Sequence, residues 1–138
     1  MGKLKNISVV FGLIVLTSFF ISCNTDIDIN AYIDKNAPLK MTIYKKNSST
    51  GFATSDNFEI AVNSNKYKKL IEWSNKNNED WQPAPASYSA NLFIGQGDFR
   101  LLTIGKGHNV VIGFTDKKGQ SNQYIKSIKK HELDFLIK

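Results

Sequence analysis

Few residues in this 138-residue chain have the types and spacing that catalysis needs. Its two histidines, His108 and His131, lie far apart, and no His-x-x-x-His pair suggests a zinc site. Acidic residues that could converge as the two carboxylates of a glycoside hydrolase are Glu72, Glu79, Asp80, Asp98 and Glu132. The folded region is small for a sugar cleft, so a small hydrolase using convergent carboxylates is the weakest of three functional hypotheses. We expect no catalytic residue and no metal site.

Two glycine pairs begin like a phosphate-binding loop but do not complete it. Residues 95–97 and 105–107 each read Gly-x-Gly, yet Arg100 and Val110 occupy the third glycine position of a Gly-x-Gly-x-x-Gly motif. Each pair leads into an apolar stretch typical of a strand, whereas a nucleotide-binding loop leads into a helix. We therefore interpret both as hairpin turns and expect no cofactor.

The single cysteine, Cys23, follows a segment that is typical of a signal peptide. Lys3 and Lys5 precede an almost wholly apolar stretch over residues 7–21. As a helix this stretch would span about 22 Å, less than the roughly 30 Å hydrocarbon core of a bilayer. A permanent membrane span is therefore the weaker interpretation, with Cys23 as a buried thiol at its end.

The residues around Cys23 resemble the lipobox of bacterial lipoproteins. Ile21, Ser22 and Cys23 match its last three positions, and Phe20 stands where this class usually has leucine. The resemblance implies cleavage of a signal peptide over residues 1–22 and attachment of diacylglycerol to the Cys23 sulfur. Several acyl chains would anchor the protein stably in the membrane of the cell envelope, because each buried methylene contributes about 0.8 kcal/mol. In a Gram-negative organism, the site would be the outer membrane or the cell surface.

The charge of the chain does not point to a nucleic-acid partner. The formal charge is +6, and removal of Lys3 and Lys5 with the signal peptide leaves +4. The remaining excess is a weak signal for nucleic-acid binding, especially outside the cytoplasm. We expect a protein partner instead.

After the signal peptide, the pattern predicts a flexible tether over residues 23–37 and one domain over residues 38–138. The tether is acidic and polar, and it shows neither helical periodicity nor a bounded strand. About 100 remaining residues can bury one hydrophobic core but not two.

The domain is predicted to be α+β, with one main helix packed on an antiparallel meander of about five to six strands. Alternation of apolar residues, with glycine at the turns, places strands over residues 39–44, 56–62, 92–94, 98–104, 110–114 and 123–128. The helix should begin after Asn63 and Ser64 and bury Tyr67 and Leu70. Residues 130–137 predict a short C-terminal helix or, equally, a short strand.

Lysines on the predicted helix point away from its apolar face. Lys66, Lys68 and Lys69 could bind an anionic partner, but we interpret them as a solvated helix face.

The proline-containing loop over residues 79–91 holds the candidate binding surface, residues 80–88. Asp80, Trp81 and Tyr88 lie in it, and tryptophan and tyrosine are frequent in recognition hot spots. The alternative is that Trp81 folds back beside Trp73 and closes the core.

These observations predict a lipid-anchored envelope protein that acts as a non-enzymatic binding module. An immunity or inhibitor protein is the most concrete form of this hypothesis. The second hypothesis is an accessory scaffold subunit of an envelope secretion or polysaccharide-handling assembly.

Overall fold

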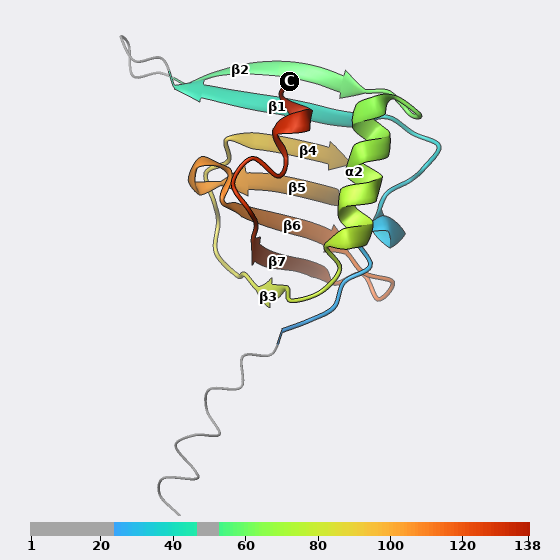
Figure 1. Cartoon of the computed structure of the whole chain (residues 1–138). Helices are drawn as coiled ribbons and strands as arrows, with labels where there is room; N and C mark the ends of the chain where they lie inside the picture. Colours follow the sequence, from blue (N-terminus) through green and yellow to red (C-terminus); the bar gives the residue numbers. More distant parts are fainter. Residues whose placement is uncertain (1–23, 47–52) are drawn as a thin grey trace, which may run out of the picture.

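The computed structural model describes residues 24–46 and 53–138, so Cys23 and the predicted signal peptide lie outside the described residues. Within these residues, seven strands form one antiparallel sheet in the order β2-β1-β4-β5-β6-β7-β3 (Figure 1). The strands are β1 Leu39–Lys46, β2 Ala53–Ile60, β3 Gln82–Pro83, β4 Leu92–Gln96, β5 Phe99–Ile104, β6 Asn109–Thr115 and β7 Ser121–Ser127. The α+β class is confirmed, and the sheet exceeds the five to six strands expected.

The extra strand, β3, lies in the proline-containing segment that the sequence predicts as a loop. Gln82 pairs with Ile125, and Pro83 pairs with Tyr124 at the edge of the sheet. An edge tolerates proline because one side of the strand makes no ladder hydrogen bonds.

The helix α2, Asn65–Lys76, lies across one face of the sheet (Figure 1). Ser64 caps it as predicted, with its hydroxyl accepting a hydrogen bond from the Tyr67 amide at 3.2 Å. Tyr67, Leu70 and Trp73 are buried beneath it. The sequence prediction of the start and buried face of α2 is confirmed.

The core lies between α2 and the sheet. Ile94, Leu101 and Ile112 stand opposite one another on β4, β5 and β6, and all three are 0% exposed. This row follows from the period of two in a strand, which sends alternate side chains to one face. Some strand bounds differ from the predicted ones by one to three residues. The strand predicted over residues 56–62 is β2, Ala53–Ile60, and Phe58 is 48% exposed on this edge strand.

Residues 24–37 pack against the core, which corrects the expectation of a flexible tether over residues 23–37. Ile27, Ile29 and Ile33 are buried in the same cluster as α2 and the sheet. Thr25 and Trp81 exchange two backbone hydrogen bonds, of 2.8 and 3.0 Å. Burial of each isoleucine contributes about 1.5–3 kcal/mol, which offsets the entropy lost by ordering this segment. The domain boundary predicted at residue 38 therefore moves toward the N-terminus, at least to residue 24.

The C-terminal segment forms a single 3₁₀ turn, Asp134–Leu136, where the sequence left a short helix or a strand open. Leu133 and Leu136 are buried, whereas Ile137 is 55% exposed. Over the described ranges, 24–46 and 53–138, no helix is long and apolar enough to span a membrane.

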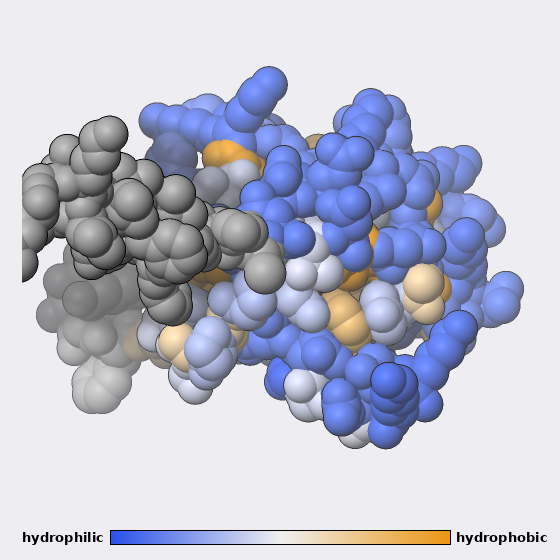
Figure 2. All heavy atoms as spheres, turned by 90° about the horizontal axis from the view of Figure 1, so that it is seen from below, coloured by the Kyte–Doolittle hydropathy of each residue, from blue (hydrophilic) through white to orange (hydrophobic). Residues whose placement is uncertain are grey.

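The end of the molecule that carries β3 is seen in Figure 2. Where the grey atoms do not cover it, hydrophilic side chains dominate this face, and the hydrophobic spots do not form a continuous band. This view shows no extended apolar surface that would insert into a bilayer.

Candidate functional site

In the binding surface predicted at residues 80–88, Trp81 is buried in the core. Trp81 is 0% exposed, and its indole Nε1 donates a hydrogen bond to the Asn77 carbonyl oxygen at 2.7 Å. Asp80 is exposed and accepts a hydrogen bond from Asn24, while Tyr88 is half-buried. The expectation of Trp81 as a binding residue is therefore corrected in favour of the alternative, a loop tryptophan that closes the core.

A different surface brings functional side chains together. A groove of about 830 Å³ lies between the C-terminal half of α2 and the segment that follows β7. We call it the basic groove because its walls include the lysines Lys69, Lys76, Lys126, Lys129 and Lys130. Two glutamates also line it, so five positive and two negative charges give a formal charge of +3 with His131 neutral.

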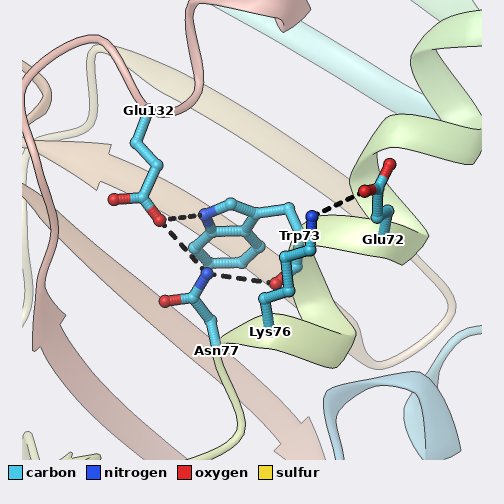
Figure 3. A network of polar contacts seen from close by, with 5 residues as sticks. All are labelled: Glu72, Trp73, Lys76, Asn77 and Glu132. Atoms are coloured by element: carbon cyan, nitrogen blue, oxygen red, sulfur yellow. Dashed lines mark hydrogen bonds and ion pairs between the residues drawn. The ribbon is translucent and has the colours of Figure 1, made fainter.

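The Glu132 carboxylate accepts hydrogen bonds from other residues in the wall of the basic groove (Figure 3). One oxygen accepts hydrogen bonds from Trp73 Nε1 at 2.8 Å and Asn77 Nδ2 at 3.1 Å. The other oxygen accepts from the Lys129 amide at 2.9 Å. Glu132 thus ties the segment after β7 to the end of α2, and it positions the lysines on either side.

Glu72 is paired with Lys76 one helical turn away (Figure 3). The Lys76 Nζ lies 2.6 Å from Glu72 Oε1, and both side chains are mostly exposed. The hydrogen bond from Lys76 is the main cause that lowers the pKa of Glu72 below its usual value, with the nearby Lys69 charge adding to it. Surface pairs of this kind contribute little to stability, but this one occupies both Glu72 and Lys76.

Four ammonium groups of the basic groove have no carboxylate partner within 4.0 Å among the described residues: Lys69, Lys126, Lys129 and Lys130. Lys126 Nζ donates to the Glu79 carbonyl oxygen at 2.9 Å and lies 5.9 Å from the Trp81 ring centroid. Lys69, Lys129 and Lys130 are exposed. Like charges gathered on one surface raise the local potential and attract anionic groups.

The basic groove is not predicted by the sequence patterns, although one of its lysines is among those considered for an anionic partner. Of the helix lysines Lys66, Lys68 and Lys69, only Lys69 lines the groove. Lys66 instead donates a hydrogen bond to the Leu136 carbonyl oxygen at 2.7 Å. The cluster of lysines at residues 126–130 was a visible signal, but its position beside α2 depends on the tertiary fold.

The carboxylates considered for catalysis are spread over the molecule. Glu72 and Glu132 line the basic groove, whereas Asp98 lines a separate hollow near Arg100. Both Glu132 oxygens accept hydrogen bonds from the protein, which holds this carboxylate in the wall of the groove. In the part of the chain that the structure describes, no three His, Cys, Asp or Glu side chains form a group that could hold a metal ion.

Comparison with protein-family models, curated proteins and solved structures found no match for this chain. Function is therefore inferred from the arrangement of its own residues and from the lipobox resemblance.

Proposed function

We propose that this protein is a lipid-anchored component of the bacterial cell envelope that binds a protein partner and catalyses no reaction. The anchor is supported by the lipobox-like residues that end at Cys23. The binding role is supported by the basic groove and its four ammonium groups without a carboxylate partner in the described residues. This second observation carries the proposal.

The partner surface should be acidic. Carboxylates from a partner would relieve the mutual repulsion of Lys69, Lys129 and Lys130 and would speed encounter through long-range attraction. Lysine is a point charge on a flexible stem, so the groove suits several separate carboxylates better than one planar group that needs bidentate contact. An acidic protein surface has this distribution of charge.

Within this proposal, an immunity or inhibitor protein is the first form, because occupying a partner needs complementarity and no catalytic group. An accessory scaffold subunit of an envelope assembly is the alternative. The first form expects a separate toxin or enzyme as the captured partner, and the second expects a subunit of the envelope machine. The hydrolase hypothesis gains no support from the basic groove, because both of its carboxylates are already paired or hydrogen-bonded.

The anchor is tested by Cys23→Ala. This variant should lose labelling by a metabolic acyl probe and should leave the membrane fraction, because the thiol that carries the lipid is gone. Ser22→Ala is the matched control, since it keeps a small residue before the cysteine and should still be labelled. Unchanged labelling of Cys23→Ala would overturn the anchor.

The binding role is tested by reversing three charges of the basic groove with Lys69→Glu, Lys129→Glu and Lys130→Glu. Chemical crosslinking in intact cells should then capture about tenfold less of the partner than the native protein captures. The matched control reverses three exposed lysines elsewhere, Lys35, Lys117 and Lys118, and should retain capture. Equal loss in both variants would show a dependence on net charge alone and would contradict a role for the groove.

A further inference from the structure

A second hollow lies on the helix-covered side of the sheet, where the C-terminal segment closes over the ends of β1, β4 and β5. Its volume is about 280 Å³. We call it the C-terminal cavity; of its lining residues, only His131 also lines the basic groove. Its size is just below the roughly 300–1,000 Å³ that is usual for small-molecule sites, so it suits a small ligand.

The walls of the C-terminal cavity are mainly apolar. Ile43 of β1, Leu92 of β4 and Leu133 of the C-terminal segment line it, with Ile137 exposed beside them. Thr103 adds a hydroxyl from β5 and is 7% exposed. Such walls suit a short hydrocarbon group.

Two residues that line the cavity have an unusual backbone conformation. Lys106 has φ 60° and His131 has φ 69°, which makes them two of the four non-glycine residues with positive φ in ranges 24–46 and 53–138. The left-handed region costs free energy for L-residues and persists only where the surrounding contacts enforce it. Such residues concentrate at binding sites, and here both line one cavity.

The charged residues that line the C-terminal cavity differ in whether an opposite charge lies nearby. Asp134 Oδ2 is 2.9 Å from His131 Nδ1 and 3.2 Å from Lys138 Nζ, so the Lys138 ammonium group already balances this carboxylate. Lys106, in contrast, has no carboxylate within 4.0 Å in the described part of the chain. An anionic group at the cavity would be attracted to Lys106.

We propose that the C-terminal cavity binds a small amphipathic carboxylate. Its hydrocarbon tail lies between Ile43, Leu92 and Leu133, and its carboxylate faces Lys106. This site is separate from the basic groove, and it does not depend on the proposed protein partner.

The test uses the full chain in phosphatidylcholine nanodiscs, with ¹³C-labelled isoleucine methyl groups observed by NMR. Hexanoate should shift the methyl signals of Ile43 and Ile137 in a saturable way, while Ile27 and Ile112, which do not line the cavity, should stay unchanged. Hexan-1-ol has the same carbon chain without the charge, and it should bind more weakly.

Lys106→Asn removes the charge while keeping a residue that tolerates positive φ. It should raise the Kd of hexanoate about fivefold and leave the Kd of hexan-1-ol unchanged. Lys117→Asn is the control for an exposed lysine outside the cavity, and an unchanged Ile112 signal reports that each variant is folded. The proposal is overturned if Ile43 and Ile137 show no saturable shift, or if hexanoate and hexan-1-ol bind equally and Lys106→Asn changes neither Kd.

Discussion

At the residue scale, Trp81 is a tryptophan in a loop, a residue type frequent in binding sites, but its side chain is buried in the core. Its backbone pairs with Thr25, its indole nitrogen donates to the Asn77 carbonyl oxygen, and the Lys126 ammonium group lies 5.9 Å from its ring centroid. One residue thus connects the N-terminal segment through its backbone, and the end of α2 and the last long strand of the sheet through its side chain. These contacts explain why a loop with two prolines keeps a defined position.

Trp81→Phe should lower the free energy of unfolding by about 2–4 kcal/mol, because it leaves a buried carbonyl without its donor and a small cavity in the core. Urea denaturation followed by circular dichroism measures this change. Tyr44→Phe is the control: Tyr44 is 44% exposed, and its substitution should stay within about 0.5 kcal/mol. A loss for Trp81→Phe as small as that for Tyr44→Phe would contradict the structural role.

At the element scale, two serines at α2 have opposite expected effects: Ser64 is the N-cap that precedes the helix, and Ser74 lies within it. Ser64 caps the first turn through the Tyr67 amide. Ser74 is 1% exposed, and its hydroxyl has no hydrogen-bond partner among the residues described. A satisfied cap stabilises a helix, whereas a buried hydroxyl without a partner costs free energy.

Ser64→Ala should therefore destabilise the protein by about 1 kcal/mol, while Ser74→Ala should cause no loss or a small gain. Chemical denaturation of both variants under the same conditions makes the comparison. Equal destabilisation by the two substitutions would contradict the assignment of Ser64 as the cap.

The turn between β6 and β7 is organised by Asp116. Its Oδ1 accepts hydrogen bonds from the amides of Lys118 and Gln120, both at 2.9 Å, and Asn122 donates to Oδ2 at 3.2 Å. These donors lower the pKa of Asp116 below its usual 3.8, with the Gln120 amide as the largest cause and burial opposing it. A depressed pKa in the folded state means that the charged carboxylate stabilises this turn.

The contribution of Asp116 should be complete above the unfolded pKa, near 3.8, and should be lost as the pH falls through the lower folded pKa. The amide proton shifts of Lys118 and Gln120 should follow one titration with its midpoint below 3.8. Asp116→Asn should abolish this titration, because the carboxamide does not ionise. A midpoint at or above the usual value would contradict the hydrogen-bonded turn.

At the scale of the whole molecule, the packed N-terminal segment places the domain close to its proposed anchor. Thr25 pairs with Trp81 beside β3, and β3 and β2 lie at opposite edges of the sheet. If Cys23 carries the lipid, the β3 edge lies nearest to the bilayer and β2 lies farthest away. The hydrophilic surface at this end suits contact with headgroups rather than insertion (Figure 2).

A nitroxide label at Gln82 of β3 should be relaxed more strongly by a lipid-bound nickel chelate than a label at Thr54 of β2. Both positions are exposed, so their distance from the bilayer sets the difference. Insertion of about ten Gly and Ser residues between Cys23 and Asn24 adds roughly 17 Å of flexible reach and should reduce the difference. Equal relaxation at Gln82 and Thr54 without the insertion would contradict this orientation.

Local patterns in the sequence were enough to predict α2 and most of the sheet. The Ser64 cap and the spacing of Tyr67 and Leu70 act within one or two helical turns, and the alternation in β5 acts within one strand. The order of Ile21, Ser22 and Cys23 is equally local, and it carries the proposed anchor.

The packing of residues 24–37 against the core and the position of the basic groove depend on the tertiary structure alone. Ile27, Ile29 and Ile33 follow no single helical or strand period, so nothing local showed that the core would bury them. Lys69 and Lys129 come together because Glu132 accepts hydrogen bonds from Trp73 on α2 and from Asn77, the C-cap of this helix. The physical reason is that burial and charge depend on neighbours in space, and these neighbours are far apart in the chain.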